Sequence, residues 1–160
     1  SMYAGISTGL INFGGSYSTS TGYSEDIDTE DAPFEIEVGL LQSNDKRWGI
    51  YYKLDNINLA DSTGDGSDYS TFGIGGQIGF TSLKNADALP FFSYGIGFGS
   101  AADLTDVSVI EVDVAVGVNY SIEQFEITAS LYRRAMAFYD SSASTTYALN
   151  GISVGENIKF

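Results

Sequence analysis

The chain contains no cysteine and no histidine, and it has only two prolines and seven basic residues. The absence of cysteine excludes disulfides, thiol catalysis and thiolate metal sites. The absence of histidine removes the commonest general base and the commonest metal ligand. Against the seven basic residues stand 21 acidic ones, which gives a formal net charge of −14. Because affinity for a phosphate backbone comes from Lys and Arg, nucleic acid is excluded as a partner. We also expect no cofactor.

Long hydrophobic runs are missing as well. The uninterrupted apolar stretches are a handful of residues long, whereas a membrane-spanning helix needs about 18–20. A length of 160 residues suits one domain, which we expect to cover 1–160. The abundant residues are glycine, with 19 copies, and the aromatic Tyr and Phe, with 11 and 10. This bias is seldom found in helical proteins and favours strands.

Strict alternation of apolar and small or polar residues runs through the chain. In 34–41, for example, Phe34, Ile36 and Val38 face one side, and Glu35 and Glu37 face the other. Eight segments alternate in this way: 2–13, 34–41, 48–55, 72–80, 92–99, 110–120, 125–132 and 152–160. The connections between them tend to alternate between short turns and longer loops rich in Ser, Thr, Gly and Asp. This layout predicts an all-β fold, an eight-stranded antiparallel up-and-down transmembrane β-barrel.

Alternation alone does not say which face is the outside. A soluble lipocalin-like barrel would turn the apolar face inward, and a membrane barrel would turn it outward. The second face is mostly Gly, Ser and Ala with isolated charges, which suits a narrow lumen better than a water-facing surface. The apolar face is almost free of charge, and aromatic residues gather at its strand ends, as they do at membrane–water boundaries. These observations favour the membrane barrel.

Three stretches resemble a known family: the opening 3–10, the glycine-alternating 92–99, and 112–120. They are similar to the small outer-membrane β-barrels of Gram-negative bacteria, of the opacity-protein, OmpX and OmpA-barrel type. Ile158 and Phe160 resemble the C-terminal signal by which the outer-membrane assembly machinery recognises such chains, although Glu156 departs from that pattern. The resemblance implies a monomer in the outer membrane, in contact with lipid and lipopolysaccharide. We expect both termini to be periplasmic.

The lumen face carries charges that hairpin pairing would place side by side. If Tyr120 pairs with Phe125, then Glu111 lies opposite Arg134, and Asp113 lies opposite Tyr132. A similar pairing around 44–46 places Glu37 opposite Lys53 and Glu35 opposite Asp55. Unlike charges on opposed strands stabilise the pair. The sequence therefore predicts a lumen salt-bridge network of Glu37, Lys53, Glu111, Asp113, Tyr132 and Arg134. This network would act either as a gate on an ion path or, as we favour, as a polar plug.

About half of the acidic residues fall in the longer loops. Asp61, Asp65 and Asp68 faintly echo a calcium-binding loop, but a solvated acidic loop is the favoured interpretation. Arg133 should point outward near the loop end of its strand, since alternation sends it to the face opposite Arg134. There it would contact the phosphates of lipopolysaccharide or simply extend to water.

The functional prediction rests on the family resemblance and on the absence of histidine. The enzymes known among small outer-membrane barrels rely on a histidine base, which this chain lacks. We therefore expect a non-enzymatic surface protein, used for adhesion or envelope integrity, whose loops contact an unknown surface ligand. The main alternative is a narrow channel for small or apolar solutes, and the other is the soluble lipocalin-like barrel that binds a ligand.

Overall fold

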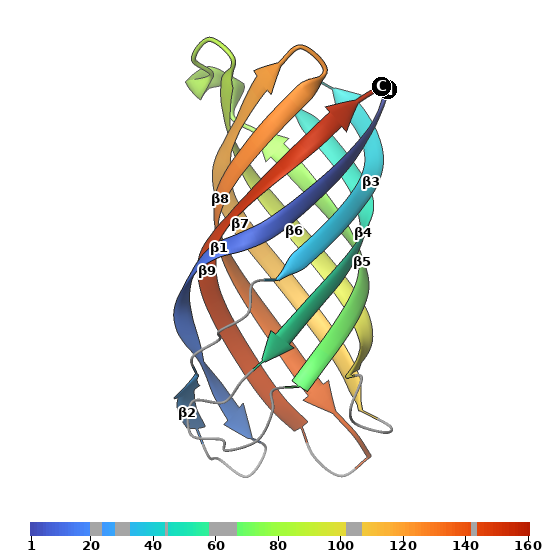
Figure 1. Ribbon diagram of the computed structural model, residues 1–160, viewed down its shortest axis with the longest axis vertical. Helices are drawn as coiled ribbons and strands as arrows, with labels where there is room; N and C mark the ends of the chain where they lie inside the picture. The colour runs from blue at the N-terminus through green and yellow to red at the C-terminus, as the bar shows by residue number, and fades with distance from the viewer. Residues whose placement is uncertain (20–23, 28–32, 44, 58–66, 102–106, 142–143) are drawn as a thin grey trace.

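Eight antiparallel strands close into a barrel (Figure 1). The computed structural model describes residues 1–160 except 20–23, 28–32, 44, 58–66, 102–106 and 142–143. Each barrel strand pairs with the next along the chain, and the first also pairs with the last, which closes the sheet. The barrel strands are β1 (Met2–Thr19), β3 (Phe34–Ser43), β4 (Lys46–Ile57), β5 (Ser67–Gly79), β6 (Ala88–Ala101), β7 (Ser108–Ile122), β8 (Phe125–Tyr139) and β9 (Ser144–Lys159). The predicted fold class is confirmed.

Two further elements lie outside this ring of strands. The short strand β2 (Ser24–Ile27) pairs with β1 over Gly15–Ser18, beyond the point where β1 leaves β3. A single 3-10 turn, η1 (Thr81–Leu83), lies between β5 and β6. Among the described residues, no helix is long and apolar enough to cross a membrane.

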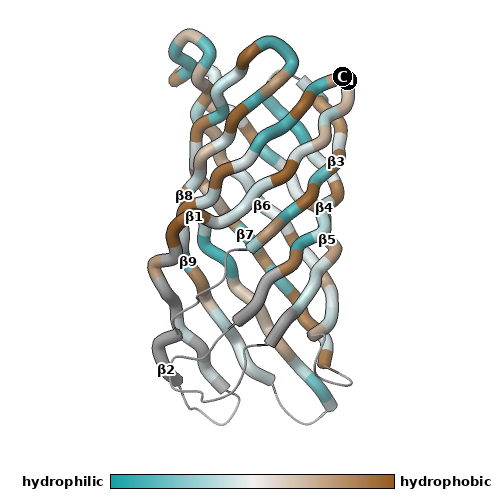
Figure 2. Tube along the Cα trace, in the orientation of Figure 1, coloured by the Kyte–Doolittle hydropathy of each residue, from teal (hydrophilic) through white to brown (hydrophobic). Residues whose placement is uncertain are grey.

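The apolar face of the sheet is the outer surface of the barrel. Phe72, Ile74 and Phe98 are 67%, 60% and 57% exposed, and the alternate positions on the same strands face the lumen. Figure 2 shows the resulting change between apolar and polar residues along each strand. Because a water-soluble barrel would bury these side chains inside, the lipocalin-like alternative is wrong. The resulting surface is the apolar coat of a barrel that contacts lipid.

Most strands are longer than the sequence pattern indicated, mainly toward the long loops. The pattern fails first in β1, where Leu10 and Ile11 are both exposed, at 62% and 52%. The β1–β9 pairing shifts between Gly9 and Ile11. Such a bulge inserts one residue and reverses which parity faces outward. A strict period of two therefore could not follow β1 beyond Gly9.

Two of the predicted strand pairings are wrong by two residues. Ile122 pairs with Phe125, so the β7–β8 turn contains only Glu123 and Gln124, where we expected four residues. Glu123 adopts a φ of 55°, the left-handed conformation that two-residue hairpin turns require. The β3–β4 register is also shifted by two residues, and this pairing contains an irregularity between Leu41 and Ser43. A shift of two residues leaves every side chain on its predicted face, so only the facing partners change.

Both termini lie at the same end of the barrel as the short turns (Figure 1). The backbone N–H of Met2 donates to the carbonyl of Phe160 at 2.8 Å, and the N–H of Phe160 donates to the carbonyl of Met2 at 3.0 Å. We call this the turn end. The opposite end, where the two longest connections between barrel strands lie (20–33 and 58–66), is the loop end.

Candidate functional site in the barrel lumen

The lumen side chains form three groups between the two ends of the barrel. The turn-end cluster consists of Tyr3, Glu37, Arg47, Gln77, Glu126, Asn157 and Lys159. The central ion cluster consists of Glu35, Lys53, Glu111, Asp113 and Arg134. The apolar lid consists of Tyr69, Val109, Met136 and Leu149, with Phe138 and Tyr147 packed against them.

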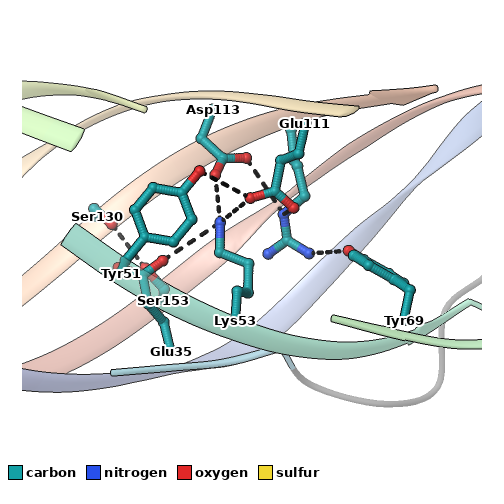
Figure 3. A network of polar contacts seen from close by, with 9 residues as sticks. Glu35, Tyr51, Lys53, Tyr69, Glu111, Asp113, Ser130 and Ser153 are labelled. Carbon is teal, nitrogen blue, oxygen red and sulfur yellow. Dashed lines mark hydrogen bonds and ion pairs between the residues drawn. The ribbon is translucent and has the colours of Figure 1, made fainter. Parts of the chain in front are cut away.

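Lys53 is the centre of the central ion cluster (Figure 3). Its Nζ lies 2.7 Å from Glu111 Oε1 and 3.4 Å from Glu35 Oε2, and it also bonds the Asp113 carboxylate. Lys53 is on β4, whereas Glu111 and Asp113 are on β7, so these bonds cross the lumen. Lys53 is 4% exposed and Glu111 is fully buried. Charges this deeply buried are tolerated only when they are paired.

Arg134, on β8, joins this cluster to the lid. Its Nε lies 3.4 Å from Asp113 Oδ1 and 4.0 Å from Glu111 Oε2. Its Nη1 donates to the Tyr69 hydroxyl at 2.7 Å, and its guanidinium lies 5.5 Å from the centre of the Tyr132 ring. The guanidinium therefore has both ionic and aromatic partners inside the barrel.

The predicted lumen residues come together, but not in the predicted pairs. The residue opposite Arg134 is Asp113, not Glu111, and Tyr132 lies opposite Ala115. The residue opposite Lys53 is Glu35, not Glu37. Glu37 instead accepts a hydrogen bond from the Tyr3 hydroxyl in the turn-end cluster. In β7–β8 the reason is a turn shorter by two residues. In β3–β4 the turn is shorter by one residue, and an irregularity between Leu41 and Ser43 adds the second position.

The turn-end cluster was not anticipated from the sequence. Arg47 Nη1 lies 2.5 Å from Glu126 Oε1, and Arg47 Nη2 donates to Gln77 Oε1 at 2.7 Å. Lys159 Nζ lies 2.8 Å from Glu126 Oε2, and Asn157 Nδ2 donates to Glu126 Oε1 at 3.1 Å. Arg47 is on β4 and Glu126 is on β8, so the two face each other across the barrel. Hairpin pairing finds only neighbouring strands. The sequence offered one sign of this cluster: pairing within hairpins left Arg47 and Glu126 on the lumen face without a partner of opposite charge.

The apolar lid fills the lumen at the loop end. Tyr69, Val109, Met136 and Leu149 are each at most 3% exposed, although they come from four different strands. The rings of Tyr69 and Phe138 meet edge to face, with centroids 5.5 Å apart. We had expected only polar filling. The sequence did not indicate the lid, because each of these four residues lies outside the bounds that alternation indicated for its strand.

Glycines on β5 and β6 make room for one large lumen ring. A Cβ atom at Gly73 would come within 2.3 Å of Tyr51 Cζ, and one at Gly97 would come within 2.7 Å of the Tyr51 hydroxyl. The Tyr51 hydroxyl donates to Glu111 Oε1 at 3.3 Å. The glycine alternation of β5 and β6 therefore allows Tyr51 to support the central ion cluster.

A chamber of about 160 Å³ lies between the two charged clusters. Its lining combines polar side chains with apolar and aromatic ones. The polar ones include Ser7, Gln77, Ser93, Thr128, Ser130, Ser153 and Asn157, and the others include Ile6, Phe91, Tyr94 and Val114. The hydroxyls of Ser130 and Ser153 lie 2.8 Å apart and share a hydrogen bond.

Three other predicted site residues, Arg133, Ile158 and Phe160, lie outside the lumen. Arg133 faces outward and its Nη1 donates to Asn150 Oδ1 at 3.1 Å. Ile158 and Phe160 are exposed on the outer face, at 37% and 67%. Asp61 and Asp65 lie outside the described residues, and Asp68 is described only as strand backbone. Among the residues that the structure describes, no group of three or more acidic side chains is placed to hold a metal ion.

Comparisons with known proteins show the fold. The crystal structure of Neisserial surface protein A matches with a TM-score of 0.69 and 17% identity, covering 99% of this chain and 97% of that chain. The solid-state NMR structure of the outer membrane protein AlkL in lipid bilayers matches with a TM-score of 0.52 and 11% identity, covering 99% and 90%. No protein-family model matches the chain, and no curated protein matches it. At these identities the likeness concerns the fold, which is that of the small eight-stranded outer-membrane barrels.

Proposed function

We propose that this chain, which has the fold of the small outer-membrane β-barrels, is a non-enzymatic surface protein that acts through its loop end. One observation supports this role above the others: the described part of the lumen is filled at both ends of the chamber. Buried ion pairs and the apolar lid occupy the space that a solute would have to cross. The acidic loop end then remains as the part that contacts another molecule, in adhesion or in envelope integrity.

The proposed orientation places the turn end, with both termini, in the periplasm and the loop end at the cell surface. Short turns on the periplasmic side and longer loops outside are the usual arrangement of such barrels. Ile158 and Phe160, exposed on the last strand, remain the residues that we propose the outer-membrane assembly machinery recognises. We propose that the folded protein is a monomer.

The loop-end role is tested by changing the first long connection. Residues 20–33 are replaced by a Gly-Ser linker, which keeps the β1–β9 pairing that extends to Thr19. We expect binding to host cells, to matrix or to neighbouring bacteria to fall, while heat-dependent gel mobility is unchanged. A matched variant keeps the connection and converts its five acids to amides: Glu25, Asp26, Asp28, Glu30 and Asp31. Unchanged binding in both variants would contradict the proposal.

The channel is the alternative function, and planar-bilayer conductance separates it from the surface role. We expect no steady openings from the native protein, because Lys53 and Arg134 are held by their carboxylates in the lumen. Steady single-channel openings that change when either residue is replaced would favour the channel.

Arg133 is proposed to contact lipopolysaccharide. Phe125 stands at the turn end of β8, and Arg133 lies eight residues farther along the strand. In a tilted strand this is a rise of about 20 Å along the barrel axis, and the apolar band of such barrels is about 25 Å tall. Its guanidinium therefore lies within reach of the phosphates at the loop-end boundary. Arg133→Ala should reduce lipopolysaccharide co-purification and leave stability in detergent unchanged, whereas Arg134→Ala should do the reverse. Equal behaviour of the two variants would contradict this role.

A further inference from the structure

The charged side chains that line the chamber differ in how accessible they are. The side chains of Glu35 and Asp113 are 25% and 20% exposed. The cations in the same lining are more deeply buried: the side chains of Lys53 and Arg134 are 5% and 4% exposed, and that of Arg47 is 9% exposed. The charge that the wall presents to the chamber is therefore mainly negative.

Glu37 is a further carboxylate in this wall, and it has no cationic partner. It lines the chamber and accepts a hydrogen bond from the Tyr3 hydroxyl. Both cations of the turn-end cluster, Arg47 and Lys159, bind Glu126 instead, at 2.5 and 2.8 Å. None of the ion pairs among the described residues includes Glu37. A carboxylate inside a barrel is stabilised by a counter-ion, and the chain supplies none to Glu37.

The described lumen as a whole has the same imbalance. Its two charged clusters hold five carboxylates and four cations: Glu35, Glu37, Glu111, Asp113 and Glu126 against Arg47, Lys53, Arg134 and Lys159. A cation that enters the chamber reduces this imbalance, whereas an anion increases it. The electrostatics of the lumen therefore favour a positively charged ligand.

The chamber has room for a ligand of several heavy atoms. Its volume is about 160 Å³, whereas a single water needs about 10–15 Å³ of such volume. The chamber is not enclosed, so a small molecule can exchange with the solvent.

The other residues of the wall indicate which type of cation fits. The hydroxyls of Ser7, Ser93 and Ser153 can accept hydrogen bonds from N–H donors, and Phe91 and Ala115 add apolar surface. A divalent metal ion such as Ca²⁺ requires several oxygen ligands, and the described residues place no group of three or more acidic side chains to hold a metal ion. An alkylammonium ion needs one carboxylate, a few acceptors and an apolar wall, and the chamber has all three.

We propose that the chamber binds a small alkylammonium ion, with the Glu37 carboxylate as its counter-ion. The ammonium group lies at Glu37, and the alkyl part lies against the apolar side chains of the wall. The existing ion pairs of the lumen stay intact when the ligand binds. This inference does not depend on the surface role of the loops, because it concerns the interior of the folded barrel alone.

Chemical-shift titration of the isotopically labelled barrel tests the proposal. The folded protein in an uncharged maltoside detergent is titrated with butylammonium chloride, and separately with butanol and sodium butyrate as neutral and anionic controls. We expect butylammonium to shift the backbone amides of Glu37 and of its strand partners Gly5 and Tyr51. Butanol and butyrate should bind about tenfold more weakly or not at all. Potassium chloride at equal concentration should not displace the amine.

Three variants locate the site. Glu37→Gln removes the charge and keeps an oxygen that accepts from the Tyr3 hydroxyl, and it should raise the Kd for butylammonium by about tenfold. Ser93→Leu fills part of the chamber without changing a charge, and it should also raise the Kd. Glu156→Gln is the matched control, because Glu156 is exposed on the outer face and its loss should leave the Kd unchanged. Heat-dependent gel mobility confirms that each variant is folded.

Three results would overturn the proposal. Equal affinity for butanol and butylammonium would mean that the chamber does not recognise the charge. An unchanged Kd in both Glu37→Gln and Ser93→Leu would place the amine outside the chamber. Displacement by an equal concentration of potassium would mean that the site takes any monovalent cation. Should Glu37→Gln not fold, Ser93→Leu and the comparison of the probes on the native protein still decide.

Discussion

At the scale of single residues, the lumen depends on Lys53. This one ammonium group bonds three carboxylates, those of Glu35, Glu111 and Asp113. Without it, Arg134 would be the only cation left in the central ion cluster. The stabilising effect of Lys53 thus includes preventing repulsion between buried like charges.

We expect Lys53→Met to lower the free energy of unfolding by about 3–5 kcal/mol, because it leaves buried carboxylates without their partner. The double variant Lys53→Met with Glu111→Gln should recover a large part of that loss. Urea titration of the folded barrel in lipid vesicles measures both, with the fluorescence of Trp48 as the signal. Trp48 is the single tryptophan and lies on the outer face. If the two substitutions add without coupling, Lys53 and Glu111 do not interact as the structure shows.

At the scale of strands and turns, the hairpins decide which residues meet. Alternation placed Lys53, Glu111, Asp113 and Arg134 on the lumen face correctly, because the side-chain period of a strand is two. It did not give their partners, since a turn of two residues and a turn of four preserve the same faces. Contacts across the barrel, such as Arg47 with Glu126, depend on closure of the whole sheet. No local pattern contains that information.

The β7–β8 turn gives a prediction at this scale. Glu123 holds a φ of 55°, which a residue with a side chain adopts at a cost and glycine adopts freely. Glu123→Gly should therefore raise the free energy of unfolding by up to about 1 kcal/mol, measured by urea titration in the same vesicles. Glu126→Gly, at the start of β8, is the contrasting variant, because it removes the partner of Arg47 and Lys159 and should destabilise the barrel. A destabilised Glu123→Gly variant would argue for a different turn.

At the scale of the whole molecule, the sequence was sufficient for the architecture and insufficient for the interior. Fold class and the direction of each face follow from composition and alternation over many strands, so an error in one strand, such as the bulge in β1, does not change the result. The lid and the turn-end cluster each bring together residues distant in sequence: Tyr69 with Leu149, and Arg47 with Glu126. Such contacts follow from the three-dimensional closure of the barrel.

The barrel carries its apolar side chains outside and its polar side chains inside, and this arrangement predicts how the protein behaves in solution. Its outer surface exposes rows of large apolar side chains, among them Phe72, Ile74, Ile96 and Phe98, and a patch of that kind does not remain in contact with water. We expect the protein to require detergent or lipid, to give a strand-type circular-dichroism spectrum, and to migrate differently in gels before and after heating. The ion pairs and the lid keep the barrel closed in the unheated sample. A chain that stays monomeric in concentrated solution without detergent would contradict the lipid-facing surface, because these side chains would then have to be buried inside.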